Sequence, residues 1–452
     1  MSINFRNIQQ RILKGDVRIH NVIINIMMSG IMKAATLACS FVMVPITIDY
    51  LNTENYGIWM AMTSILYWFA FFDVGLANGM RNYLSEALSL GDYVKARSYF
   101  STAIFLLSGI AMMIGCASVP VVYLCDFKSL FNTQSIDSSF LANVLAIAII
   151  FSLIQFVVKT IGVVYIAMQK YAINDFITFL GNLTSVIAIF ILTKTTEGNL
   201  LYVVLAFTGL PVLIFTLASI PLLKQYPQLM PSLKSIDIET AKKVITKGLG
   251  FFIIQITSCL VIFGSANMFI SYFCGPEQVT VYNVSYKLFN ILVIGYTILI
   301  SPLWNAYTDA AAQDDYNWIR KIFKKSLKLW AISVLVGLLL LALSGWFLHL
   351  WIGDRVHVPF ILSACILLYV CMFNFANCTA YLLNGMNKIR VEMIVSVVAS
   401  ILYLLTFGIW GDKLDVKYIV LAMALSYGVM GIIYLYQSKL IINRKAKGIW
   451  NL

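Results

Sequence analysis

Hydrophobic residues occur in long uninterrupted blocks along the chain, separated by short polar segments. A helix of about 20 apolar residues crosses the ~30 Å hydrocarbon core of a bilayer. Membrane strands are shorter and alternate apolar with polar positions, so continuous blocks indicate helices. We predict an all-α polytopic membrane protein with twelve transmembrane helices, at 21–48, 56–79, 99–124, 140–168, 173–193, 200–223, 249–274, 280–304, 327–350, 359–385, 391–410 and 417–438.

Basic residues are distributed unequally between the two sets of connections that these spans define. The two termini and the loops after spans 2, 4, 6, 8 and 10 hold 24 Lys and Arg residues, whereas the opposite loops hold 5, when Lys328 and Lys417 at the starts of spans 9 and 12 are counted with the adjoining loops. Connections rich in Lys and Arg remain on the cytoplasmic side of a membrane. We therefore expect both termini to be cytoplasmic.

Composition supports the membrane prediction and limits the partners. Hydrophobic residues make up 60% of the chain, charged residues 12%, and the mean hydropathy is +0.86. Soluble domains are about 45–50% apolar and about 25% charged. The net charge of +12 follows from the loop asymmetry and suits anionic lipid headgroups, so no nucleic-acid partner is needed to explain it. The eight cysteines and three histidines show no metal-ligand spacing, and we expect no metal site.

An internal repeat relates the two halves of the chain. A shift of 223 positions aligns two stretches without a gap, with identical residues at several positions. A shift of 218 similarly places Lys170 on Lys388. Six spans followed by six in the same orientation form a parallel repeat, whose substrate site lies between the halves. We predict an N-lobe at 1–223 and a C-lobe at 224–452, and a transporter that works by alternating access. The identities in the first shift are Glu54 with Glu277, Asn82 with Asn305, Ala87 with Ala310, Asp92 with Asp315, Tyr93 with Tyr316, Arg97 with Arg320 and Phe100 with Phe323.

Polar residues form a stripe along one face of the first predicted span. Asn25, Ser29, Lys33, Thr36 and Ser40 recur every three or four residues, which is one helix face. Lys33 is near the middle of this span, roughly 18 Å from either end, beyond the reach of a lysine stem. A charge at the centre of a bilayer costs about 2.5–3.5 kcal/mol, so Lys33 should face a wet cavity.

Two further spans carry similar polar faces. Gln155 and Lys159 lie in span 4, and Asn283, Lys287 and Asn290 lie in span 8. The two lysines are closer to span ends than Lys33, so snorkelling to the membrane surface explains them as well as a cavity does. The amides fit either substrate contact or hydrogen bonds between helices. A cationic, amide-lined cavity suits an anionic headgroup with sugars beside it.

The stretch from Tyr50 to Asp92 resembles a known transporter family. It reads Tyr50-Leu51, Tyr56-Gly57-Ile58-Trp59, Asp73-Val74-Gly75-Leu76-Ala77-Asn78, Arg81, Glu86-Ala87 and Gly91-Asp92. Gly275-Pro276-Glu277, Val281-Tyr282-Asn283-Val284 and Leu383-Asn384-Gly385-Met386-Asn387-Lys388 extend the pattern into the second half. Together these motifs resemble the bacterial polysaccharide-biosynthesis flippases, which move O-antigen or capsule repeat units. Asn52 departs from the pattern, because the family often has glycine after the leucine.

The resemblance implies two six-helix lobes around a cationic central cavity, within a superfamily that also holds multidrug exporters and the peptidoglycan-precursor flippase. It implies a lipid-linked oligosaccharide as substrate, with the oligosaccharide attached to undecaprenyl pyrophosphate, and a bacterial plasma membrane as location. Membrane lipids are the other expected partners, and the resemblance adds a polysaccharide polymerase and a chain-length regulator. It implies no catalytic residue and no enzyme activity, since flipping makes and breaks no bond.

Two alternatives remain open from the sequence. A cation-coupled multidrug or solute exporter of the same superfamily needs carboxylates within the spans, and only Asp73 is a candidate; with Arg81 it forms either an ion pair or a coupling site. A membrane-embedded enzyme needs clustered acid, base or nucleophilic groups, which the basic loops lack. No cofactor is expected, and a proton gradient, a sodium gradient or the membrane potential would each fit as the energy source.

Overall fold

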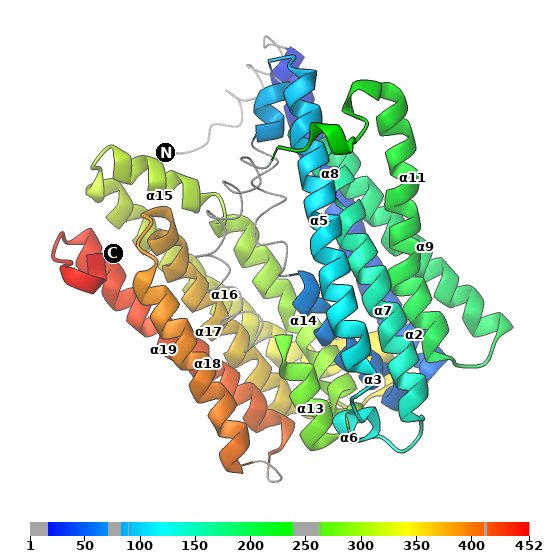
Figure 1. Cartoon of the computed structure of the whole chain (residues 1–452). Helices are drawn as coiled ribbons and strands as arrows, with labels where there is room; N and C mark the ends of the chain where they lie inside the picture. The colour runs from blue at the N-terminus through cyan, green and yellow to red at the C-terminus, as the bar shows by residue number, and fades with distance from the viewer. Residues whose placement is uncertain are drawn as a thin grey trace. The chain divides into compact units, whose positions relative to one another are not determined.

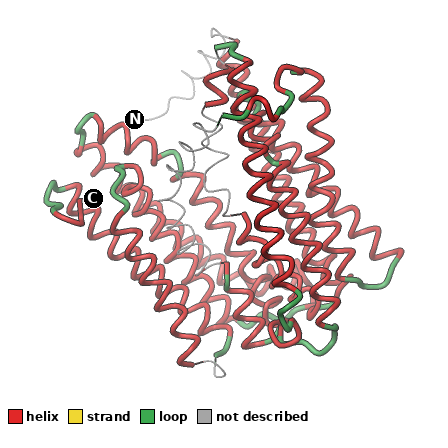
Figure 2. Tube along the Cα trace, viewed as in Figure 1, coloured by secondary structure: helices red, strands yellow, loops and turns green. Residues whose placement is uncertain are grey.

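The computed structural model describes residues 17–70, 83–88, 90–237, 262, 264–410 and 414–451. Within these ranges the chain forms helices joined by short turns and contains no β-strand (Figure 2). Ten helices in the described ranges are long and apolar enough to cross a membrane. The prediction of an all-α polytopic membrane protein is therefore confirmed. Predicted spans 2 and 7 extend into 71–82 and 238–261, outside the described residues, so the number twelve stays a prediction.

The helices divide between two compact units. Unit 1 contains 1–50, 72–124 and 142–249, and unit 2 contains 51–71, 125–141 and 250–452. The described helices of unit 1 are α2 (Val17–Leu51), α5 (Tyr93–Val122), most of α7 (Ser138–Val158), α8 (Thr160–Ala167), α9 (Tyr171–Thr195), α10 (Leu200–Val204), the π-helical turn η2 (Leu205–Gly209) and α11 (Leu210–Gln225), followed by the short turns η3 (Pro227–Leu229) and η4 (Leu233–Ser235) (Figure 1).

Unit 2 combines the helices of the second half with two segments from the first half. Its described helices are α3 (Thr53–Ala70), α6 (Phe127–Phe131), α13 (Ala266–Cys274), α14 (Pro276–Ile300), α15 (Leu303–Ala312), α16 (Tyr316–Ile352), η6 (Gly353–Arg355), α17 (Phe360–Gly385), α18 (Arg390–Trp410), α19 (Val416–Ile442) and η8 (Gly448–Asn451). Within it α19 packs against α17 and α18, as Figure 1 shows in orange and red.

Helix α3 packs closely against α14 within unit 2. A side chain on Gly57 would place its Cβ only 1.7 Å from the carbonyl oxygen of Pro276, so only glycine fits there. One turn away the Thr280 hydroxyl donates to the carbonyl oxygen of Thr53 at 2.6 Å. These contacts explain why residues 51–71 group with the second half. The division of the repeat into an N-lobe at 1–223 and a C-lobe at 224–452 stays a prediction.

The predicted repeat has matching turn geometry at the starts of α5 and α16. Gly91 and Asp314, which are 223 positions apart, both have a positive φ, of 72° and 58°. The next residues, Asp92 and Asp315, both cap their helices by accepting a hydrogen bond from the backbone N–H three residues later, at 3.0 and 2.9 Å. Such a cap satisfies one of the free N–H groups at a helix start. The aligned identities therefore reflect a shared local structure.

The same repeat explains the departure at Asn52. Asn52 and Gly275 are 223 positions apart, and both have positive φ, of 72° and 90°. Glycine adopts this region without strain, and asparagine tolerates it better than most other residues. Asparagine therefore preserves the turn that the resemblance leads one to expect.

Each unit has its own buried apolar core. In unit 1, Phe100, Val164 and Phe215 from three helices are buried against one another. In unit 2, Tyr307 and Phe323 pack with Leu382 at the junction of α15, α16 and α17. These cores keep the polar residues of each unit in defined positions on their helices.

Candidate functional site

Lys33 forms a polar cluster with two residues in unit 1. Its ammonium lies 3.8 Å from a carboxylate oxygen of Asp175 on α9, and the Ser29 hydroxyl donates to the same carboxylate. The Lys33 side chain is 70% exposed, whereas that of Asp175 is 15% exposed. The ammonium is therefore open to a second anion on its exposed side, while the half-buried carboxylate lies beside it.

Helices α2 and α9 run parallel, with polar contacts near both ends. Ser29 meets Asp175 near one end, and the Tyr50 and Thr196 hydroxyls lie 2.8 Å apart near the other. In both pairs the partners are 146 positions apart, so the two helices keep the same register over this length. This parallel pairing determines which residues of α9 can reach Lys33.

Lys33 lies near the middle of α2, and its depth in the bilayer stays a prediction. Helix α2 has 35 residues, so Lys33 is about 24 Å from its first residue and about 27 Å from its last. A helix about 52 Å long exceeds the hydrocarbon core of about 30 Å, and its midpoint need not lie at the membrane centre. Asp175 is only about 6 Å along α9 from Tyr171. The pair is therefore close to the end of α9 that follows the turn at Gln169.

Sequence reasoning missed Asp175 and Glu392, and it was wrong that Asp73 is the single candidate carboxylate. Glu392 is 5% exposed in the first turn of α18. It accepts a hydrogen bond from the Asn384 amide at 3.5 Å, and its second carboxylate oxygen has no hydrogen-bond partner in the described part of the chain. Both residues are within the first three residues of predicted spans. A carboxylate at a span boundary is easily assigned to the adjoining polar loop. Its position inside the predicted span was the signal that could have identified it.

Lys159 and Gln155 lie at or near an interruption in the α-helix of span 4. The span is one apolar segment, but Lys159 separates α7 from α8. The Thr160 hydroxyl donates back to the carbonyl oxygen of Val157 at 2.6 Å, a contact that often bends helices. Lys159 is exposed and Gln155 is half-buried. The structure therefore places this lysine at the interruption between α7 and α8, on a different helix from Lys33.

The predicted polar face of α14 is used partly for packing. The Asn283 amide donates to Asn267 on α13 at 2.9 Å, and Asn267 donates to the carbonyl oxygen of Met60 on α3 at 3.1 Å. Asn283 thus joins three helices, which favours the interhelical interpretation. Asn290 accepts from the Tyr286 hydroxyl at 3.1 Å, and Lys287 is half-buried between the two asparagines.

Three predicted residues cannot be placed in a site. Asp73 and Arg81 lie outside the described residues. Asn25 belongs to α2, but its side chain also lies outside the described part. Their roles remain predictions.

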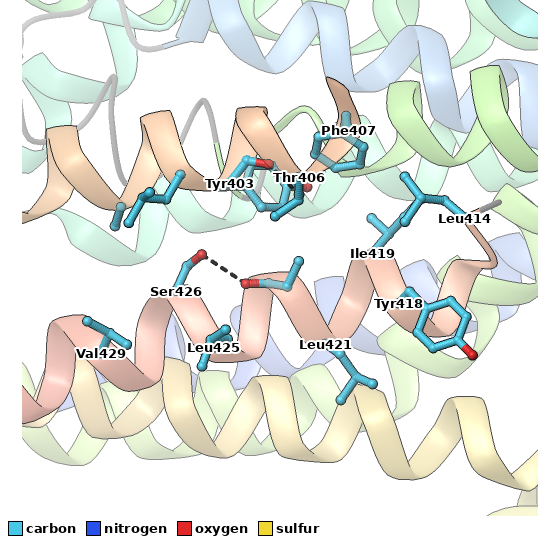
Figure 3. Close-up of a pocket in the computed structure, with 13 residues that line it drawn as sticks. Tyr403, Thr406, Phe407, Leu414, Tyr418, Ile419, Leu421, Leu425, Ser426 and Val429 are labelled. Carbon is cyan, nitrogen blue, oxygen red and sulfur yellow. Dashed lines mark hydrogen bonds between the residues drawn. The ribbon is translucent and has the colours of Figure 1, made fainter. Parts of the chain in front are cut away.

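An apolar cavity of about 570 Å³ lies between α18 and α19 (Figure 3). Tyr403, Phe407 and Leu425 are among its lining residues. Its Thr406 and Ser426 hydroxyls both donate to carbonyl oxygens of their own helices, at 2.6 and 2.8 Å. These hydroxyl protons are thus already used, so the cavity suits a hydrocarbon chain rather than a sugar or an ion.

The arrangement can bind but offers little for covalent chemistry. Lys33 supplies a held positive charge, and the α14 face adds an ammonium beside two amides. No group of three or more His, Cys, Asp or Glu side chains suitable for a metal ion occurs in the described ranges. Each of these two groups by itself suits contact with an anion or a hydroxyl, and their joint role in one site stays a prediction.

Comparisons with known proteins agree with the sequence-based resemblance. A Salmonella typhi protein named "Putative O-antigen transporter" is 20% identical over 441 residues, covering 94% of this chain and 98% of that protein. A Yersinia pseudotuberculosis O-antigen export protein, also named as putative, is 22% identical over 314 residues, covering 68% of this chain and 69% of its own. The chain matches no family model. The curated relatives are named as transporters and not as enzymes.

Solved structures show the fold. A multidrug resistance MATE family transporter of the MOP superfamily has a TM-score of 0.72 at 12% identity, covering 94% of this chain and 98% of that one. A MOP superfamily transporter from Pyrococcus furiosus, reported with a binding pocket of reversed polarity, has a TM-score of 0.56 at 12% identity, covering 94% and 95%. The chain therefore has the fold of MOP superfamily membrane transporters.

Proposed function

We propose that this protein is a flippase that moves undecaprenyl-pyrophosphate-linked oligosaccharide from the cytoplasmic to the outer leaflet of a bacterial plasma membrane. The observation that carries the proposal is Lys33, a largely exposed ammonium on an apolar helix, paired with a half-buried carboxylate. A charge facing hydrocarbon is costly, so we infer that Lys33 faces water. The O-antigen relatives, matched over nearly the full chain, supply the class of substrate.

In this proposal Lys33 attracts the pyrophosphate of the substrate, and Lys159 and Lys287 assist. Gln155, Asn290 and Asn25 meet sugar hydroxyls, while Asn283 mainly supports the helix packing around them. The polyprenyl tail stays in lipid as the headgroup crosses by alternating access. Both termini are cytoplasmic in this scheme because the loop charges are so unequal. A polymerase and a chain-length regulator would receive the flipped repeat units.

A gene deletion in the host tests the function. Spheroplasts with a glycan-specific probe report which leaflet holds the lipid-linked oligosaccharide. We expect accumulation on the cytoplasmic leaflet, loss of surface polysaccharide, and rescue by the wild-type gene but not by Lys33→Gln. A Lys224→Gln variant, which loses an exposed lysine at the end of α11, is the matched control and should rescue. Normal delivery of the oligosaccharide to the outer leaflet in the deletion strain would contradict the proposal.

A cation-coupled multidrug or solute exporter is the second candidate. The carboxylates of Asp175 and Glu392 favour it more than the sequence alone did, because such exporters need intramembrane carboxylates. Overexpression in a drug-sensitive strain distinguishes the two functions. Resistance that is lost in Glu392→Gln, with unchanged surface polysaccharide in the deletion strain, would support export instead of flipping.

A further inference from the structure

One face of α16 carries four lysines and then a run of apolar residues. Lys321, Lys324, Lys325 and Lys328 are all exposed, and their spacing of three, one and three places them on one side of two helical turns. Helix α16 contains no Asp or Glu, so no carboxylate on this helix compensates the four charges. Like charges at these spacings destabilise a helix. An external anion along the stripe would relieve this repulsion.

The apolar residues continue the same face of the helix. Ile332, Leu335, Leu339, Leu343 and Trp346 follow at intervals of three or four residues, and each is between 49% and 68% exposed. The distance from Ile332 to Trp346 is about 21 Å along the helix axis. The face is therefore basic over about 10 Å and apolar over a length comparable to one lipid chain.

The repeat-related face in unit 1 is covered by protein. A shift of 223 places Lys324 and Lys325 on Ser101 and Thr102 of α5. The Ser101 hydroxyl accepts from the backbone N–H of Ser232 at 3.1 Å, and the Thr102 hydroxyl accepts from that of Asp237 at 2.8 Å. The segment after α11 thus lies across this face of α5, with η3 and η4 packed on it.

The corresponding segment in unit 2 takes a different course. Arg97 of α5 donates to the carbonyl oxygen of Met230 at 2.7 Å, and the repeat-related Arg320 donates to the Asn443 side chain at 3.0 Å. Both arginines therefore hold the start of the segment that follows the sixth helix of their repeat. After Asn443, however, the chain turns to α18 and α19, where η8 packs. The lysine face of α16 is left exposed where its counterpart is covered.

We propose that this face of α16 binds anionic phospholipids of the bilayer, with the headgroup phosphates on the four lysines and an acyl chain along the apolar stripe. The residue types favour bulk phospholipid over a single specific pyrophosphate ligand. Lysine is a flexible, strongly hydrated point charge, whereas arginine provides the planar fork suited to bidentate phosphate recognition. Arg320, the only arginine of α16, is engaged with the end of α19. The proposed lipid surface uses none of the residues assigned to substrate binding, so it does not depend on the proposed function.

The test uses full-length protein in detergent, titrated with fluorescent phosphatidylglycerol and with phosphatidylcholine. Wild type should prefer the anionic lipid. The stripe variant, with Lys321, Lys324, Lys325 and Lys328 all changed to Gln, should bind phosphatidylglycerol at least about tenfold more weakly, since each lysine near an anionic surface contributes attraction. The four corresponding Lys→Arg changes keep the charge and should restore binding. Equal binding by wild type and the stripe variant would overturn the proposal.

A matched control shows whether lipid binding depends on these four lysines or only on the net charge of the protein. A variant with Lys224, Lys234, Lys445 and Lys447 changed to Gln loses the same charge from exposed sites elsewhere and should keep the preference. An equal loss in this control would show that net charge alone is responsible, which overturns the site. Stronger binding of undecaprenyl pyrophosphate than of phosphatidylglycerol to the stripe would assign it to that lipid instead.

Amine labelling of wild-type protein gives an answer that does not depend on variant folding. In nanodiscs containing phosphatidylglycerol, the four stripe lysines should react more slowly with an amine-reactive reagent than in phosphatidylcholine nanodiscs. Lys234 and Lys445 should react equally in both. Equal labelling of the stripe in the two lipids would contradict the proposal.

Discussion

Lys33 and Asp175 are 142 positions apart in the chain, yet they meet at 3.8 Å on two parallel helices. The carboxylate is mostly buried and the ammonium is mostly exposed. This asymmetry distinguishes the pair from an ion pair that only stabilises packing, because the lysine remains accessible to a second anion. The Ser29 hydroxyl also donates to the carboxylate, so Asp175 keeps a hydrogen bond when Lys33 contacts another anion.

Neutral substitutions at Lys33 and Asp175, singly and together, should show whether the pair binds ligand or only supports the structure. Lys33→Gln should reduce flipping at least about tenfold, which corresponds to about 1.4 kcal/mol of lost attraction to an anion. Asp175→Asn should retain flipping, because the lysine is freed rather than removed. The double variant should behave like Lys33→Gln. Flipping rates in reconstituted vesicles measure this, and restored transport in the double variant would show that the pair is only structural.

Gly57→Ala should destabilise the contact between α3 and α14. The new Cβ would lie 1.7 Å from the Pro276 carbonyl oxygen, so the helices must separate. We expect a loss of about 3 kcal/mol or more in unfolding free energy, seen as poor yield and a lower Tm in detergent. Gly109→Ala in α5 is the control, because nothing lies within 4 Å of its Cβ position. That change should be neutral or stabilising by about 0.5–1 kcal/mol, and similar Tm values for the two variants would refute the contact.

Asn283→Ala should lower stability more than Asn290→Ala. Asn283 connects α14 to α13, whereas Asn290 accepts a hydrogen bond from Tyr286 on its own helix. Interhelical hydrogen bonds in membranes contribute about 0.6–2 kcal/mol. Thermal unfolding in detergent should therefore show the larger decrease in Tm for Asn283→Ala. If Asn283 served mainly to contact substrate, the Tm decrease for Asn283→Ala would be no larger than that for Asn290→Ala. Flipping per folded molecule would then fall as well.

The Asp92 cap should weaken in acid. Hydrogen bonds from the Lys95 backbone N–H and its ammonium hold the pKa of this carboxyl below its ordinary value. A lowered folded-state pKa means that the stabilisation is present above the unfolded-state pKa of about 3.9 and is lost as the pH falls through the folded-state value. The Tm difference between wild type and Asp92→Asn should therefore shrink as the pH is lowered below about 4. A constant difference across this range would contradict the role of the charge.

Much of the fold could be predicted from apolar blocks, because the membrane thickness sets helix length and forbids other spanning structures. The repeat was also recognisable, and positions such as Asp92 and Asp315 prove to be matching helix caps. The grouping of α3 with the second half was not foreseen. It depends on the contact between Gly57 and Pro276, which hydropathy cannot reveal.

The candidate site was predicted less completely than the fold. Lys33 could be found because a lysine inside an apolar helix is unusual. Asp175 could not be paired with it, since no periodicity within one helix shows which residue of another helix lies opposite. Asn283 looked like a cavity residue, but its amide is directed to α13. A polar stripe on one helix does not show whether that face contacts water, substrate or a neighbouring helix.

The central claim is that Lys33 provides positive charge for translocating a lipid-linked oligosaccharide. The most direct test reconstitutes wild type, Lys33→Gln and Lys33→Arg in vesicles with labelled undecaprenyl-pyrophosphate oligosaccharide, and measures how much reaches the opposite leaflet. The account predicts rapid transfer by wild type, substantial transfer by Lys33→Arg and little by Lys33→Gln, with all three equally folded. Equal transfer by Lys33→Gln and wild type, or no transfer by any of them above protein-free vesicles, would contradict it.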